Sequence, residues 1–189
     1  LSDEKFRTML VKEFEVRKDI DDVAIIIQGP VEGIESFVVK TVNFYSKAFP
    51  NAKLILSTWE GEQANLISDC LSTIENLIIL KNRYLLERGP SNLNLQLKTT
   101  LAGLKLANDL GFDYAIKIRT DMRFYNTKVF DYFDFLAESH DSESKYQKIY
   151  VPNFNSFYKR VYSPTDQFQF GKTKTLIDFW TLANPNSLK

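Results

Sequence analysis

Apolar and polar positions alternate along residues 23–120 in a pattern that separates buried strands from amphipathic helices. Short apolar runs that end at polar or turn-forming residues predict strands at 23–27, 53–59, 77–80 and 114–120. Helical segments are predicted between these strands, at 37–45, 61–72 and 93–107. The repeated strand–helix order predicts an α/β fold with a mostly parallel central sheet, right-handed crossovers and flanking helices.

The second half of the chain is less regular and rich in aromatic residues. A helix is expected at 129–136, a short strand at 149–151, a strand at 166–170 that Gly171 ends, and a closing helix at 176–180. Residues 3–17 look like a charged helical lead-in. The aromatic stretch 153–163 has no clear period, so it is either core or a platform for a sugar.

Composition narrows the class of protein. The chain has 189 residues, which fits one domain, and equal numbers of basic and acidic residues, 24 each, argue against a nucleic-acid binder. A single cysteine, Cys70, excludes an internal disulfide and a multi-cysteine zinc site, and it suits a reducing compartment. No apolar run reaches about 18 residues and no signal peptide is visible, so we expect no membrane span.

Several familiar catalytic motifs are missing. The sequence has no GxGxxG after the first strand, no GxxxxGK[ST] and no GxSxG, which argues against dinucleotide oxidoreductases, P-loop kinases and serine hydrolases. The only histidine, His140, falls in a polar stretch, 138–144, that predicts a surface loop. An enzyme with this sequence must therefore use carboxylates or a metal for its chemistry.

The most informative segment runs from Asp113 to Phe124, where an apolar strand leads into a carboxylate between two arginines. If the strand stays regular, Lys117, Arg119, Asp121 and Arg123 share one side. Ligands of open α/β sheets bind at the carboxyl ends of strands, so this row points to an anionic ligand such as a nucleotide diphosphate.

The segment leaves the role of a metal open. In one interpretation Asp121 binds Mn²⁺ or Mg²⁺ that bridges a diphosphate, or orients the donor sugar. In another, Arg119 and Arg123 neutralise the diphosphate directly. The structural alternative is that Asp121 caps the segment that begins at Met122, or pairs with one of these arginines.

Two other strand ends carry candidate binding residues. Gln28, Gly29 and Pro30 follow the first strand, where a base or ribose is expected, although the same residues fit an ordinary turn. Trp59 and Glu60 follow the second strand and suit stacking and hydroxyl recognition. Alternatively, Trp59 fills the edge of the core and Glu60 begins a helix.

The helix predicted after Gly89-Pro90 contains further candidate binding residues. Ser91 is the expected N-cap, and Asn92, Gln96 and Lys98 are candidates to bind an anion near the helix N-terminus, although a solvated face would look the same. Asp166 opens a later strand and is the candidate general base if the reaction inverts the sugar carbon. Its alternative role is an N-cap or turn residue.

Five blocks of sequence together resemble the WavE family of lipopolysaccharide-synthesis proteins. They occur in the order found in that family, over about residues 23–180, and the STWEG and RTDMRF blocks are the most specific. The blocks lie at 25–31, 49–52, 56–61, 94–104 and 117–124.

The resemblance implies a GT-A-like fold that transfers sugars from nucleotide diphosphates. It implies one domain over 1–189, with a nucleotide-sugar-binding half at 1–125 and an acceptor-side half at 126–189. Such enzymes carry an Asp-x-Asp metal motif where this chain has Asp121-Met122-Arg123, so the second carboxylate is missing. They often continue beyond the helix around Trp180, so we expect that part of the acceptor site lies outside this chain.

The leading hypothesis is a glycosyltransferase of hexosyltransferase type that builds lipopolysaccharide or another bacterial surface polysaccharide. Its partners would be a nucleotide-diphospho-sugar donor and a glycan or lipid-linked glycan acceptor, with cytoplasmic location either free or peripheral to the inner membrane. The rivals are a non-catalytic nucleotide- or glycan-binding module and a nucleotidyltransferase that makes activated sugars. Nucleotidyltransferases usually have a basic glycine-rich loop after strand one, and residues 28–33 contain no basic residue.

Overall fold

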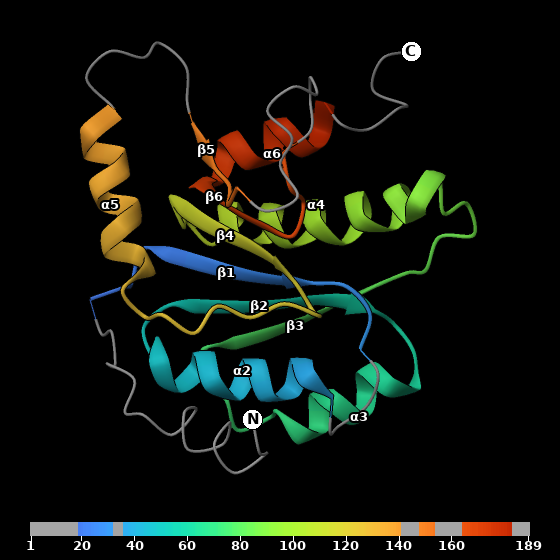
Figure 1. The fold of residues 1–189 in the computed structure, drawn as a ribbon. Coiled ribbons are helices and arrows are strands. Elements are labelled where there is room, and N and C mark those ends of the chain that lie inside the picture. The colour runs from blue at the N-terminus through green and yellow to red at the C-terminus, as the bar shows by residue number, and fades with distance from the viewer. Residues whose placement is uncertain (1–18, 32–35, 141–147, 154–163, 183–189) are drawn as a thin grey trace, which may run out of the picture.

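The computed structural model describes residues 19–31, 36–140, 148–153 and 164–182. Six strands form one sheet in the order β3-β2-β1-β4-β6-β5, between two layers of helices (Figure 1). The strands are β1 (Val23–Gln28), β2 (Lys53–Trp59), β3 (Leu77–Asn82), β4 (Tyr114–Arg119), β5 (Ile149–Tyr150) and β6 (Phe168–Lys172). The predicted α/β fold with a mostly parallel sheet is confirmed.

Four parallel strands form the part of the sheet that the sequence predicted. β1 pairs in parallel with β2 and with β4, so that Ile26 lies opposite Ile55 on one side and Lys117 on the other. The chain proceeds outward from β1 to β2 and β3, and then returns through α4 to place β4 on the other side of β1. The strand order therefore reverses between β1 and β4, and a crevice forms at the carboxyl ends of strands at such a point.

Two helical layers cover the sheet because the strand side chains alternate between its faces. Ile25 and Ile27 of β1 pack with helices α2 (Phe37–Ala48), α3 (Glu62–Cys70) and α5 (Val129–His140). Ala24 and Ile26 pack with α4 (Leu93–Asp109) and α6 (Thr173–Leu182). In Figure 1, α4 and α6 lie above the sheet and α2 and α3 below it.

Helix α4 approaches the sheet closely, and this contact positions one wall of the candidate site. A side chain at Gly103 would place its Cβ 2.6 Å from Cγ2 of Ile26 and 3.4 Å from Cβ of Ser57. The Ser57 hydroxyl donates a 2.7 Å hydrogen bond to the carbonyl oxygen of Thr99. The absence of a side chain at Gly103 therefore lets α4 lie directly on β1 and β2.

Several boundaries differ from the sequence predictions. β6 begins at Phe168, so Asp166 lies before the strand that it was predicted to open. Asn92, not Ser91, is the N-cap of α4, and both have positive φ in a short 3₁₀ turn, η1 (Pro90–Asn92). Gly171 lies inside β6, not at its end, because β4 and β5 pair on either side of it. His140 is the last residue of α5, so the helix continues into the stretch predicted as a loop.

The predictions for residues 3–17 and 154–163 fall outside the described residues. In the part of the chain that the structure describes, no helix has both the length and the apolar character needed to cross a membrane.

Candidate functional site

A cavity of about 450 Å³ opens at the carboxyl ends of β1, β2 and β4, where the strand order reverses. This volume lies within the range of pockets that hold small organic ligands. The lining comes from three strand ends, from the first residues of α2 and α4, and from the β3–α4 connection. The lining residues used below are Gln28, Gly29, Pro30, Ser36, Phe37, Trp59, Tyr84, Arg88, Asn92, Gln96, Thr99, Arg119, Thr120 and Asp121.

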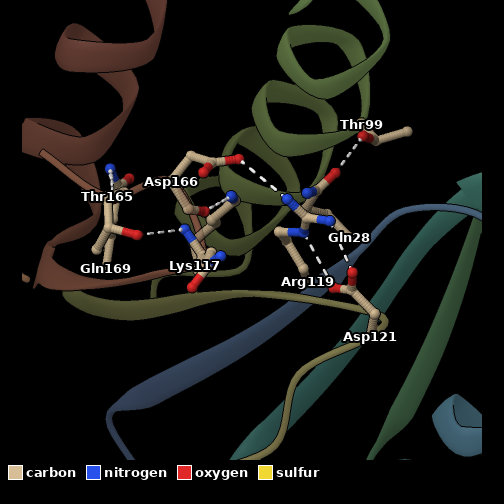
Figure 2. A network of polar contacts seen from close by, with 9 residues as sticks. Gln28, Thr99, Lys117, Arg119, Asp121, Thr165, Asp166 and Gln169 are labelled. Atoms are coloured by element: carbon tan, nitrogen blue, oxygen red, sulfur yellow. Dashed lines mark hydrogen bonds and ion pairs between the residues drawn. The ribbon is translucent and has the colours of Figure 1, made fainter. Parts of the chain in front are cut away.

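Gln28 lies in this cavity with a fixed orientation. Its side chain is buried, and its Oε1 accepts a 2.8 Å hydrogen bond from the hydroxyl of Thr99 on α4 (Figure 2). Among the described residues, no hydrogen bond is recorded for the Nε2 of the same amide. Because Gln28 lines the cavity, its Nε2 is available to donate to a ligand there.

Gly29 allows the ends of β1 and β4 to come together. It has a φ of 135°, and a Cβ at this position would lie 2.6 Å from Oγ1 of Thr120. Its N–H donates to the carbonyl oxygen of Ser57 at 3.1 Å. Pro30 follows as an exposed residue of the cavity lining, so the three residues predicted after the first strand all lie at the site.

Arg119 lies between two carboxylates at the end of β4, as Figure 2 shows. Its Nε and Nη2 donate to the two carboxylate oxygens of Asp121 at 2.9 and 2.6 Å. Its Nη1 lies 3.7 Å from Oδ2 of Asp166. Hydrogen bonding to Asp121 raises the pKa of Arg119, so the guanidinium stays charged at the edge of the cavity.

Asp121, the predicted metal ligand, is paired with a guanidinium in this structure. Both carboxylate oxygens of Asp121 accept hydrogen bonds from Arg119. Within the described residues, no group of three or more histidine, cysteine, aspartate or glutamate side chains could hold a metal ion. The position where a metal ligand was considered therefore presents a guanidinium–carboxylate pair.

An aromatic wall closes one side of the cavity. The rings of Trp59 and Tyr84 meet edge to face with centroids 5.1 Å apart, and the guanidinium of Arg88 lies 5.7 Å from the centre of the Tyr84 ring. Trp59 was a candidate from the sequence, whereas Tyr84 and Arg88 were not. Both residues could have been found from their position after the third predicted strand, because the carboxyl end of that strand reaches the same edge of the sheet.

Two helices begin at the cavity. Ser36 and Phe37 at the start of α2, and Asn92 and Gln96 at the start of α4, belong to the lining. The first backbone N–H groups of a helix have no partner within it and carry partial positive charge. At α4 the N–H groups of Asn92, Leu93 and Asn94 already donate to the carbonyl oxygens of Gly89, Pro90 and Arg88. An anionic group is therefore favoured by the start of α2 and by the guanidinium groups of Arg88 and Arg119, with the side chains of Asn92 and Gln96 beside them in the lining.

Lys98 and Glu60 lie away from the cavity lining. Lys98 is exposed on the outer side of α4 and borders a separate hollow with Leu97 and Leu101. Glu60 is also exposed, and its backbone N–H donates to the carbonyl oxygen of Asn82 at 2.9 Å.

Arg123 does not share a side with Arg119, so the predicted row of charges is wrong beyond residue 119. The strand ends at Arg119, and the N–H of Met122 turns back to the carbonyl oxygen of Arg119 at 3.1 Å. The Arg123 guanidinium instead donates to Oγ1 of Thr41 at 2.9 Å and to the carbonyl oxygen of Phe37 at 3.0 Å. These contacts attach Arg123 to α2, outside the cavity lining.

Lys117 supports the site from within the sheet. It is fully buried, its Nζ donates to the backbone oxygen of Asp166, and it lies 4.9 Å from the centre of the Trp180 ring. Burial lowers the pKa of Lys117 to about 7, while the negative charge of Asp166 opposes this shift. Lys117 therefore links β4 to the turn that carries Asp166.

Solved structures with a similar fold support the α/β assignment. The 4-diphosphocytidyl-2C-methyl-D-erythritol synthase of Anaerococcus prevotii matches with a TM-score of 0.52 and 15% identity, over 88% of this chain and 78% of the synthase. This likeness shows the fold alone.

Two further structures match less well. A protein assigned to the nucleotide-diphospho-sugar transferases, from Desulfovibrio desulfuricans, has a TM-score of 0.49 and 10% identity, over 82% of this chain and 65% of that protein. A cytidylyltransferase from Leptospira borgpetersenii has a TM-score of 0.48 and 12% identity, over 83% of this chain and 63% of the cytidylyltransferase. The chain thus spans slightly less than two thirds of these two proteins.

Sequence comparison identifies the family. No curated protein shows significant similarity to the chain. The family described as WavE lipopolysaccharide synthesis matches residues 23–185, which includes every strand and the candidate site. With more than half of its length matched, the chain belongs to the WavE lipopolysaccharide synthesis family.

Proposed function

We propose that this protein binds a nucleotide-diphospho-sugar and transfers the sugar to a lipopolysaccharide or other surface-glycan acceptor. One observation carries the proposal: a single cavity joins an aromatic and amide wall to a cationic end where two helices begin. The wall suits a nucleoside, and the cationic end suits the diphosphate that follows it. Membership of a lipopolysaccharide-synthesis family supports the same class of reaction.

The residues divide between the two ends of the donor. Trp59 and Tyr84 stack beside the base, and Gln28 donates its free amide hydrogen to a carbonyl oxygen of the nucleoside. Arg88 and Arg119 face the diphosphate, with Asn92 and Gln96 beside it at the start of α4. Gly29 and Pro30 form the turn beneath the nucleoside.

Arg119 takes the role that a divalent cation has in related chemistry. As the bond from the sugar carbon to the diphosphate oxygen breaks, negative charge grows on the leaving nucleoside diphosphate. The Nε hydrogen and one Nη2 hydrogen of Arg119 are donated to Asp121, so the hydrogens of Nη1 and the second hydrogen of Nη2 are the ones left to stabilise this charge. Asp121 and Asp166 hold Arg119 on two sides, and we infer that donor binding needs no metal at Asp121.

Asp166 is the proposed general base. It removes the proton from an acceptor hydroxyl while the acceptor oxygen bonds to the sugar carbon and the nucleoside diphosphate departs from the opposite side. This sequence inverts the configuration at that carbon. The 3.7 Å ion pair between Asp166 and Arg119 supports this role, because it brings the carboxylate to the edge of the donor cavity.

A nucleotidyltransferase is the second candidate, because the fold is shared with a diphosphocytidyl-methylerythritol synthase. Such an enzyme must bind a nucleoside triphosphate and release pyrophosphate. The turn after β1 supplies no basic side chain for the extra phosphate, since residues 28–33 read Gln-Gly-Pro-Val-Glu-Gly. This composition favours transfer from a diphosphate donor.

Calorimetric titration with UDP, GDP and CDP tests the donor site. We expect one of them to bind, and we expect Arg119→Lys to weaken its binding about tenfold, since a lysine loses the paired hydrogen bonds. Arg83→Lys is the matched control, because Arg83 is exposed and does not belong to the cavity lining. If none of these nucleotides binds, the donor-site proposal is wrong.

The same titration with EDTA and with Mn²⁺ or Mg²⁺ tests the metal. Equal affinity in both conditions supports neutralisation of the diphosphate by Arg119. Binding that appears only with metal indicates that Asp121 binds a cation instead. Product analysis then separates the reactions. Release of a nucleoside diphosphate indicates sugar transfer, release of pyrophosphate indicates nucleotidyl transfer, and binding without turnover indicates a non-catalytic module.

A further inference from the structure

A second hollow lies on the outer side of α4, separate from the donor cavity. It has a volume of about 840 Å³ and is bordered by α4 and by residues 83–87 of the connection that follows β3. Tyr84 belongs to the lining of both hollows, so the two sites are neighbours on either side of this residue. None of the proposed catalytic steps uses the outer hollow.

The outer hollow presents apolar side chains to solvent. Leu86 is 95% exposed, which is the largest value among the exposed large hydrophobic residues of the described chain. Leu101 of α4, which is partly exposed, adds apolar surface to the same hollow, and the buried Leu97 lies at its base. Exposing a whole leucine side chain to water is unfavourable, so a surface of this kind is commonly a binding surface.

Basic side chains surround this apolar surface. Arg83, Lys98 and Lys105 belong to the hollow, and Glu87 is its one acidic residue. None of the three basic residues forms a recorded ion pair within the described part of the chain. Because the whole chain has equal numbers of basic and acidic residues, this local positive excess is a property of the surface, not of the composition.

We propose that this basic and apolar hollow docks on an anionic phospholipid surface. Leu86 inserts between the headgroups, and Arg83, Lys98 and Lys105 lie at the level of the lipid phosphates. Long, flexible basic side chains around an exposed aliphatic residue match the charge and the layered polarity of such a surface. Docking would bring the adjacent donor cavity toward lipid-linked acceptors, a consequence that rests on the proposed function, whereas the docking itself does not.

Vesicle co-sedimentation tests the proposal. We expect the protein to bind phosphatidylcholine vesicles that contain phosphatidylglycerol, to bind pure phosphatidylcholine vesicles far more weakly, and to dissociate as salt is added. Each lysine near an anionic surface should strengthen binding about fivefold, and the two effects multiply. The double variant Lys98→Gln/Lys105→Gln should therefore bind about 30-fold more weakly. Leu86→Ser should weaken binding at least about tenfold.

Helix α2 supplies a matched control. Lys40 and Lys47 are exposed and seven residues apart, the same spacing as Lys98 and Lys105 on α4. The variant Lys40→Gln/Lys47→Gln loses the same charge from another surface and should keep its vesicle binding. Equal binding by the two double variants would overturn the proposal, because binding would then depend on total charge only.

Two further results would also overturn it. One is the absence of binding to the anionic vesicles. The other is self-association in size-exclusion chromatography that Leu86→Ser abolishes while vesicle binding is absent, which would assign the hollow to a second copy of the chain. Nucleotide titration of the same variants should be unchanged, so a failure of docking can be distinguished from a failure of the donor site.

Discussion

Replacing the buried lysine of β4, Lys117, should change how stability depends on pH. Burial lowers the pKa of Lys117 from 10.5 to about 7, against the opposing attraction of Asp166. Below pH 7 both the folded and the unfolded chain carry the proton. Between pH 7 and 10.5 the unfolded chain binds it and the folded chain does not, so the free energy of unfolding rises with pH.

The size of the effect follows from this window. One pKa unit corresponds to about 1.4 kcal/mol, and half of the folded molecules are already deprotonated at pH 7. The free energy of unfolding should therefore rise by about 2 kcal/mol between pH 7 and pH 9. Methionine at position 117 has a similar length and no charge, so Lys117→Met should lack this rise. It also loses the hydrogen bond to the Asp166 backbone, which lowers stability equally at each pH.

Urea unfolding followed by far-ultraviolet circular dichroism at pH 6, 7, 8 and 9 measures the slope. The control is Lys172→Met, which removes an exposed lysine of β6 and should keep the pH dependence of the parent chain. A flat stability profile of the parent chain from pH 7 to 9 would contradict the reasoning. So would an equal rise in Lys117→Met, because the rise would then come from other groups.

Three further substitutions test packing and binding. Gly103→Ala should lower the melting temperature, because the new methyl group overpacks against Ile26. Overpacking costs about 1–3 kcal/mol, which exceeds the roughly 1 kcal/mol that alanine adds to helix stability. An unchanged melting temperature would show that α4 shifts to accommodate the methyl group. Tyr45→Phe should lower the free energy of unfolding in urea by about 1–2 kcal/mol, because the Phe124 N–H loses its 3.0 Å bond to the Tyr45 hydroxyl. Trp59→Ala should weaken nucleotide binding in calorimetry about tenfold through lost stacking, and equal affinity would remove this ring from the donor site.

The parallel part of the fold was predictable from the sequence because its information is local. Uninterrupted apolar runs such as 23–27 require burial on both faces, and helices between them require crossovers of one hand. Parallel strands gather their carboxyl ends at one edge, so the sequence also predicted that Gln28, Glu60 and Arg119 would meet. The structure brings Gln28 and Arg119 into one cavity, whereas Glu60 lies outside its lining and the neighbouring Trp59 lies in it.

The antiparallel edge was not predictable in the same way. The pairing of β6 with β4, which sets Phe168 opposite Ile118, joins residues 50 positions apart and depends on contacts that no local pattern contains. The position of Asp166 beside Arg119 follows from this pairing and from the bond between Lys117 and the Asp166 backbone. The sequence therefore identified Asp166 as a candidate, but only the tertiary structure showed that it lies beside Arg119.

Side-chain direction beyond a regular element also required the tertiary structure. The row Arg119, Asp121 and Arg123 looks continuous in the sequence, but the turn after residue 119 ends the alternation and sends Arg123 to α2. Lys98 falls on the outer side of α4 because the contact at Gly103 sets the rotation of the helix on the sheet.

The sequence by itself determined the fold class, the edge of the sheet where the site lies and the kinds of charge present there. The tertiary structure decided which charges meet. Both oxygens of Asp121 accept hydrogen bonds from Arg119, a contact that depends on how the chain turns after β4 and not on residue spacing. Periodicity fixes the face on which a side chain lies, whereas the partner of a charge depends on distances in space, and these are set by the packing of the whole sheet.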